Sequence, residues 1–151
     1  EAEPTAAPSP TPGASGVSTR PCTTGDIAVL AVTDQEVYSG SERPKVSITL
    51  TNEGLESCLM DVGTATQVFE ITSGEDVWWR STDCQSESSN HVVQLEPGQT
   101  VSSSTPLEWD RTRSNVDTCE KERPRARAGY YNLTVSIGGM QAADARQFIL
   151  R

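Results

Sequence analysis

Four cysteines constrain the fold of this chain more than any other feature. They are Cys22, Cys58, Cys84 and Cys119, and none belongs to a CxxC pair, so neither a zinc knuckle nor a redox motif is indicated. An even number of widely spaced cysteines in an acidic, Ser/Thr-rich chain predicts two structural disulfides formed in an oxidising compartment. The sequence therefore predicts an extracytoplasmic protein, either secreted or at the cell surface.

Four cysteines allow three disulfide connectivities. We favour Cys22–Cys58 and Cys84–Cys119. Cys22 precedes the first predicted strand and Cys58 follows the second full strand, so one bridge could pin the N-terminal strand. Cys84 and Cys119 each lie in a long polar segment, so the other bridge could join two loops.

Length and charge narrow the function further. A chain of 151 residues fits one domain and a tail. Its net charge of −9 argues against nucleic acid and against anionic membrane surfaces as partners. No apolar run approaches the roughly 18 residues of a membrane span, and the first residues do not resemble a signal peptide. We therefore expect membrane anchoring only through a segment outside this sequence.

Residues 1–21 are predicted to be a disordered linker or stalk. They hold five of the nine prolines, without apolar periodicity or aromatic residues. Such a composition cannot repay the entropy of ordering and favours an extended spacer. The folded domain is accordingly expected over residues 22–151.

The remainder of the chain has a β pattern. Apolar or alternating stretches bounded by turn residues predict strands near residues 26–32, 46–51, 68–71, 77–80, 91–95, 100–109, 130–137 and 147–150. Residues 73–76 predict a hairpin with a four-residue loop. No segment shows a 3.6-residue period. Seven to nine short antiparallel strands predict an all-β, immunoglobulin-like β-sandwich.

Two family resemblances rest on short motifs. The stretches 50–54, Cys58, 61–64, 77–84, 109–113 and 117–119 resemble exported actinobacterial proteins of unassigned function, which have one membrane span, a stalk and a cysteine-paired β-sandwich. That resemblance implies a topology and a location. Residues 78–81, 95–99, Trp109 and 129–130 resemble the Bacillus intracellular proteinase-inhibitor family, which implies inhibition of proteases.

Two local features are candidates for binding. Adjacent strand residues point to opposite faces, so one of Trp78 and Trp79 should fill the core while the other faces outward and could stack on a sugar or peptide. Residues 111–127 hold six of the twelve basic residues, and could dock an anionic group. The alternatives are packing under a loop and pairing with nearby carboxylates. The candidate binding residues are Trp78, Trp79, Arg80, Arg111, Arg113, Arg123, Arg125 and Arg127.

Catalysis and metal binding are not indicated. His91 is the only histidine, and no Gly-x-Ser-x-Gly elbow accompanies it. Nor do the acidic residues have calcium-loop spacing. We expect no catalytic residue, cofactor or metal.

The sequence favours a non-enzymatic interaction domain of the cell envelope, with an unidentified protein or cell-wall polymer as partner. One alternative is a protease inhibitor presenting a disulfide-braced loop, in the region of residues 81–90. A second alternative is a structural spacer domain without a specific ligand.

Overall fold

The computed structural model describes residues 18–103 and 105–151, which form strands, loops and one short 3-10 turn, η1 (Thr64–Thr66). The strands are β1 (Ile27–Thr33), β2 (Val37–Tyr38), β3 (Lys45–Asn52), β4 (Cys58–Asp61), β5 (Gln67–Ser73), β6 (Asp76–Arg80), β7 (Val92–Leu95), β8 (Thr100–Ser102), β9 (Leu107–Glu108), β10 (Gly129–Ile137), β11 (Met140–Gln141) and β12 (Arg146–Leu150). Within this described part, eight strands have four or more residues, in line with the seven to nine that were predicted.

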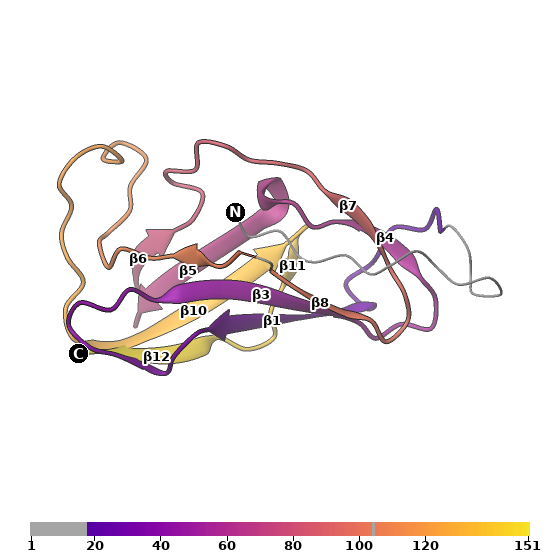
Figure 1. The fold of residues 1–151 in the computed structure, drawn as a ribbon, viewed down its shortest axis with the longest axis horizontal. Helices are drawn as coiled ribbons and strands as arrows, with labels where there is room; N and C mark the ends of the chain where they lie inside the picture. Colours follow the sequence, from indigo (N-terminus) through magenta and orange to yellow (C-terminus); the bar gives the residue numbers. More distant parts are fainter. Residues whose placement is uncertain (1–17, 104) are drawn as a thin grey trace.

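Two main sheets face each other (Figure 1). In the first, β3 lies between β1 and β8 and also pairs with β9. The second has the order β2-β12-β10-β5-β6, with β11 paired to β10, and β4 and β7 form a small third sheet. The β2–β12 pair is parallel, whereas the remaining pairs among these strands are antiparallel. The predicted immunoglobulin-like sandwich with two disulfides is confirmed.

The core lies between the sheets and follows the alternation of the sequence. In β3 and β10, every second side chain is buried and the intervening ones are half-buried or exposed. Trp109 is fully buried, with its ring centroid 5.7 Å from that of Tyr131 and 6.3 Å from that of Phe148. The Tyr131 hydroxyl donates to the Arg127 carbonyl over 2.7 Å, a tyrosine-corner contact that is typical of these sandwiches.

Three local expectations were wrong. Ser73 pairs with Asp76, so the β5–β6 loop has two residues rather than four, and Gly74 takes the positive φ of 61° that such a tight turn favours. The strand expected over residues 100–109 is divided into β8 and β9, because Pro106 between them has no N–H to donate. β4 was not predicted from the sequence.

Both favoured disulfides are present. Cys22 is bonded to Cys58 with 4.9 Å between the Cα atoms, and Cys84 to Cys119 with 5.5 Å. The described residues include no free cysteine. Two disulfides favour an oxidising, extracytoplasmic location.

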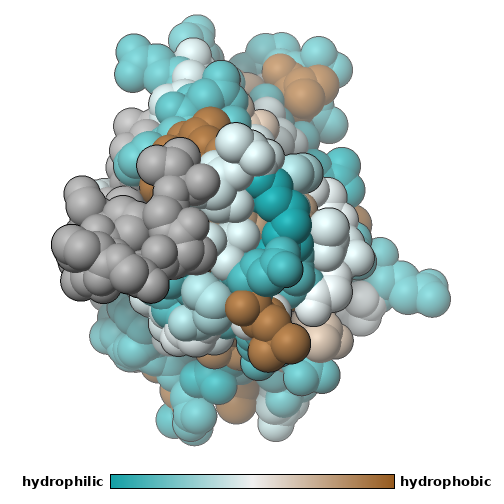
Figure 2. Space-filling model, turned by 90° about the vertical axis from the view of Figure 1, so that its right-hand side faces the viewer, coloured by the Kyte–Doolittle hydropathy of each residue, from teal (hydrophilic) through white to brown (hydrophobic). Residues whose placement is uncertain are grey.

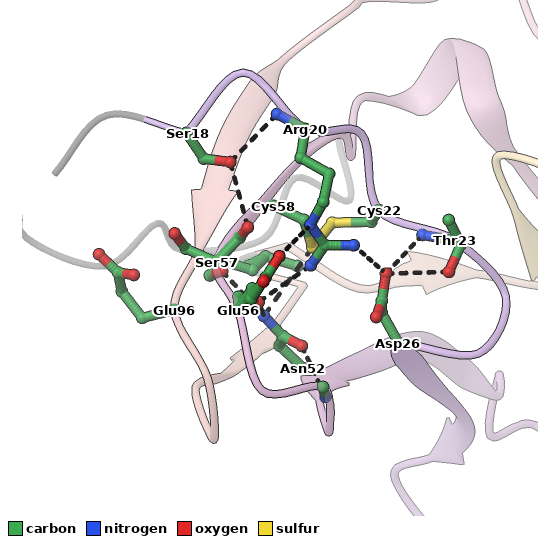
Figure 3. Close-up of a disulfide and its surroundings, with 12 residues drawn as sticks. Ser18, Arg20, Cys22, Thr23, Asp26, Asn52, Glu56, Ser57, Cys58 and Glu96 are labelled. Carbon is green, nitrogen blue, oxygen red and sulfur yellow. Dashed lines mark hydrogen bonds and ion pairs between the residues drawn. A yellow bond between two sulfur atoms is a disulfide. The ribbon is translucent and has the colours of Figure 1, made fainter. Parts of the chain in front are cut away.

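Residues 18–21 are bonded to the domain, although they were assigned to the linker (Figure 3). The Ser18 amide donates to Gln94 over 2.8 Å, and Arg20 forms an ion pair of 2.8 Å with Asp26. A hydrogen bond from the Thr23 amide, followed by the Arg20 contact, holds the pKa of Asp26 below its usual range. Pro21 bridges to Leu59 of β4. The rest of the predicted linker, residues 1–17, lies outside the described residues.

On the end of the sandwich formed by β4 and β7, the described residues visible in Figure 2 show apolar side chains as separate spots. Leu55, in the loop before β4, is the most exposed of the large apolar residues described, at 97%. Single exposed apolar residues are normal on protein surfaces. Across residues 18–103 and 105–151, no helix has the length and apolar character that crossing a membrane requires.

Candidate binding site

The two adjacent tryptophans lie on β6, where the strand is irregular. Trp79 pairs with Ile71 and Val77 pairs with Thr72, so Trp78 is an extra residue in a β-bulge. A bulge breaks the strict alternation of side chains. As a result Trp78 and Trp79 are both half-buried and both pack against the core, and neither fits the expected arrangement of one buried and one outward ring.

The basic segment 111–127 covers the outer edge of β6. It is the long orange loop beside β6 in Figure 1. The Ser114 amide donates to the Trp78 carbonyl over 2.9 Å, and the Arg80 amide donates to the Ser114 hydroxyl, also over 2.9 Å. The Cys84–Cys119 disulfide ties the far part of this segment to the loop that follows β6. The segment therefore closes an edge strand that would otherwise present unpaired peptide groups.

Arg113 covers the ring of Trp78. Its guanidinium carbon lies 4.0 Å from the ring centroid, a cation–π contact. The same guanidinium donates to both carboxylate oxygens of Asp76, over 3.0 and 2.9 Å. This fork holds the pKa of Asp76 below its usual range. Trp78 and Arg113 thus already contact each other.

Two further predicted arginines are paired within the domain. Arg80 donates from Nε to Glu70 over 3.0 Å, across the outer face of the second sheet. Arg123 forms an ion pair of 2.9 Å with Asp110, and its other terminal nitrogen lies 3.7 Å from the sulfur of Cys84. The Arg80 pair therefore links β6 to β5, and the Arg123 pair holds the loop in place, so neither arginine is left as a free charge.

Arg111 is a buried structural residue with 4% exposure. Its guanidinium donates to the carbonyls of Ser39, Glu42 and Arg151, over 2.6, 3.1 and 3.0 Å. Burial, with a smaller effect of nearby Arg125, lowers its pKa from the ordinary value. Arg111 joins the start of the basic segment to the β2–β3 connection and to the end of the chain, so it is not placed to contact a partner.

Arg125 and Arg127 are exposed. Neither forms an ion pair with another residue of the described ranges. Of the six arginines predicted to bind, these two alone remain available on the described surface. Two exposed charges are a small basis for an anion site.

A hollow of about 300 Å³ opens beside Trp79, and Cys84 of the Cys84–Cys119 disulfide is one of its lining residues. It lies between the two sheets, with β5 and β6 of the second sheet on one side and β9 of the first sheet on the other. Its apolar wall consists of Trp79, Phe69 and Leu107, and two carboxylates, Glu87 and Glu108, line it as well. Glu108 is paired with Arg43 at 3.4 Å, whereas Glu87 is exposed and has no ion pair within the described residues.

The loop over this hollow is held at both ends. Cys84 is fixed by its disulfide. At the other end, the Ser89 amide donates to the Thr64 hydroxyl and the Ser89 carbonyl accepts from Ala65, each over 2.9 Å. Gly63 passes so close that a Cβ there would clash with the Ser89 carbonyl oxygen. Residues 85–88, between these anchors, are exposed.

The sequence pointed to one wall of this hollow and missed the rest. Trp79 was among the predicted binding residues, while Glu87, Leu107 and Glu108 were not. These residues come from three separate segments, and no spacing in the sequence connects them. A half-buried aromatic wall next to carboxylates can stack on an apolar face and accept hydrogen bonds. No group of three or more metal-ligating side chains occurs within the described ranges.

Comparisons with known proteins assign no family. No family model and no curated protein matches the chain. Among solved structures, it is similar to the Pseudomonas fluorescens alkylpurine DNA glycosylase AlkC bound to abasic-site DNA, at 13% identity and a TM-score of 0.47, over 83% of this chain and 30% of that one. A β-glucosidase, EmGH1, from Erythrobacter marinus matches with the same identity and TM-score, over 83% and 15%. The sporulation control protein Spo0M of Bacillus subtilis matches at 12% and 0.43, over 84% and 50%.

In all three cases the chain spans half or less of the protein that it matches. At this level of similarity the neighbours carry no argument about activity, ligand or partner.

Proposed function

We propose that this chain is a non-enzymatic interaction domain of the cell envelope, which binds a protein or polymer through the hollow beside Trp79. In this proposal it is the ectodomain of a membrane-anchored protein. The observation that carries the proposal is the hollow itself, a rigidly framed concavity with an aromatic wall and a carboxylate, Glu87, that has no ion pair within the described residues. The resemblance to exported stalked proteins agrees with this placement.

The size and chemistry of the hollow define what it could hold. Its volume of about 300 Å³ is at the lower end for a ligand site, enough for one side chain or one sugar unit. A matching group would lay a flat or aliphatic face on Trp79 and direct a cationic or hydroxyl group to Glu87. A lysine or arginine side chain of a partner protein and an amino-sugar unit of a polymer both meet this description.

A charge reversal at the hollow tests the proposal. The chain of residues 1–151 is measured against immobilised envelope polysaccharides and a library of basic peptides. For Glu87→Lys we expect affinity at least about tenfold weaker than for the wild type, because the new ammonium group repels the cation or removes the acceptor. This change is cleaner than Trp79→Ala, since Trp79 also packs against the core.

The matched control is Glu75→Lys, which makes the same charge change at the exposed tip of the β5–β6 hairpin. It should bind as the wild type does. Equal affinity in all three proteins would place the contact elsewhere. No retention of any probe would contradict the binding function and favour the spacer alternative.

One observation favours protease inhibition as a second candidate. Residues 85–88 form an exposed segment between a disulfide and a hydrogen-bonded anchor, and a braced loop of this kind can enter a protease cleft. Titration against a panel of serine and cysteine proteases tests it. An inhibitor should give stoichiometric loss of protease activity with the loop intact, whereas cleavage between residues 85 and 88 without inhibition would dismiss this candidate.

A further inference from the structure

The sandwich has one long edge strand with an open side in the described part of the chain. β1 has seven residues and pairs only with β3, at the margin of the first sheet (Figure 1). It contains no charged residue and no proline. Proteins usually protect edge strands with charges, prolines, bulges or short length, because open edges pair with other chains.

The other sheet edges of the described residues are protected or short. The 111–127 segment covers β6, and residues 20–22 bond to Leu59 of β4, with N···O distances of 2.7 and 2.8 Å. β2, β8 and β9 have three residues or fewer, and β7 has four. β1 is longer than all of these strands, and unlike β4, β6 and β9 it carries no charged residue.

The register of β1 shows which peptide groups are open. Asp34 donates to the Lys45 carbonyl, and Glu53 donates to the Asp26 carbonyl, at the two ends of the β1–β3 ladder. Hydrogen-bonded pairs alternate along an antiparallel ladder, so the even-numbered residues of β1 direct their peptide groups to β3. The odd-numbered residues direct theirs to the open side, where the structure pairs none of the described segments with them.

A groove runs beside this open edge. It has a volume of about 330 Å³ and lies between residues 30–33 of β1 and residues 144–146. Leu30 is 56% exposed on the outer face of the sheet at its rim. Main chain can therefore approach β1 from this side.

We infer that β1 is a self-association edge, at which two copies of this chain pair antiparallel about a two-fold axis through Leu30. In this register Ile27 faces Thr33 and Val29 faces Ala31, so every open peptide group of one copy meets an open group of the other. Leu30 faces Leu30 as a non-hydrogen-bonded pair, in which side chains approach closely. The same patch serves both copies, as a two-fold interface requires.

The chemistry of β1 favours a second copy over a foreign peptide. The strand has no charge with which to select a charged partner, and its apolar sequence is matched by itself when reversed about Leu30. At the ends of the ladder Asp26 would face Asp34 of the second copy. Arg20 supplies a counter-charge to Asp26 in its own chain, whereas Asp34 accepts from the neutral Tyr38 hydroxyl, so this facing pair weakens the dimer.

The interface is a strand edge, so it is small and the dimer is weak, with a Kd on the order of 100 µM. Each chain carries a net charge of −9, so added salt should strengthen the dimer by screening the repulsion between copies. A dimer held by ion pairs would respond in the opposite direction.

Sedimentation velocity of residues 1–151 over a concentration series tests the inference. We expect a concentration-dependent monomer–dimer equilibrium that Leu30→Lys weakens at least about tenfold, because two ammonium groups would meet on the axis. Val92→Lys is the matched control: it adds the same charge at an exposed apolar residue of β7, 61% exposed, and should dimerise like the wild type.

Hydrogen exchange locates the contact independently of any variant. The amides of Val29 and Ala31 should become more protected as the protein concentration rises, while those of β7 should not change. A chain that stays monomeric to about 1 mM, or a dimer that Leu30→Lys leaves intact, would overturn the inference. The binding function proposed for the Trp79 hollow stands or falls separately, since its test uses different residues.

Discussion

Replacing both cysteines of the Cys22–Cys58 bridge with alanine is expected to lower the free energy of unfolding by about 5 kcal/mol. Loop closure over a separation of 36 residues accounts for about 4 kcal/mol of this in the chain-entropy model. The remainder comes from the native state, because Cys58 is fully buried and its sulfur lies 3.8 Å from the amide nitrogen of Asn52. Guanidinium denaturation followed by tryptophan fluorescence measures the loss.

The Cys84–Cys119 bridge supplies the comparison. Its separation of 35 residues predicts the same loop-closure contribution to stability, about 4 kcal/mol. However, Cys84 is exposed, so its replacement by alanine leaves no cavity in the core. The double variant of this pair should therefore lose about 1 kcal/mol less than that of the first pair. A larger loss here than at Cys22–Cys58 would contradict the assignment of Cys58 to the core.

Replacing Arg111 with alanine is expected to cost about 3 kcal/mol, because three hydrogen bonds to carbonyls are lost in a buried setting. Arg111 has a φ of 64°, and alanine keeps the same unfavourable backbone conformation, so the change isolates the side chain. Thermal and chemical denaturation of the purified variants measure the effect.

Two further variants separate the effect of the buried guanidinium's geometry from the effect of removing a positive charge. Arg111→Lys keeps the charge but cannot reproduce the planar fork, so it should lose about half as much stability. Arg125→Ala removes an exposed arginine of the same segment and should remain within about 0.5 kcal/mol of the wild type. If Arg111→Ala were as stable as Arg125→Ala, the buried guanidinium would not be holding the β2–β3 connection and the chain end together.

The contacts made by the basic segment 111–127 show why its composition was a poor guide to the binding site. Six basic residues in seventeen positions suggested a surface for anions. In the folded chain, Arg113 lies on Trp78, Arg123 contacts Asp110 and Arg111 donates to backbone carbonyls. Each partner is distant in sequence or on another turn of the loop, so counting charges could not reveal that these three arginines already have partners.

The sequence by itself determined the class of the fold and the number of its disulfides. Alternation in β3 and β10 is local information, since each strand carries its own two-residue period, and the cysteine positions limited the disulfides to three patterns. Only the tertiary structure decided the bulge at Trp78, the covering of β6 and the hollow beside Trp79. These features depend on which segments meet across the sandwich, and contacts between distant segments leave no periodic signal in the chain.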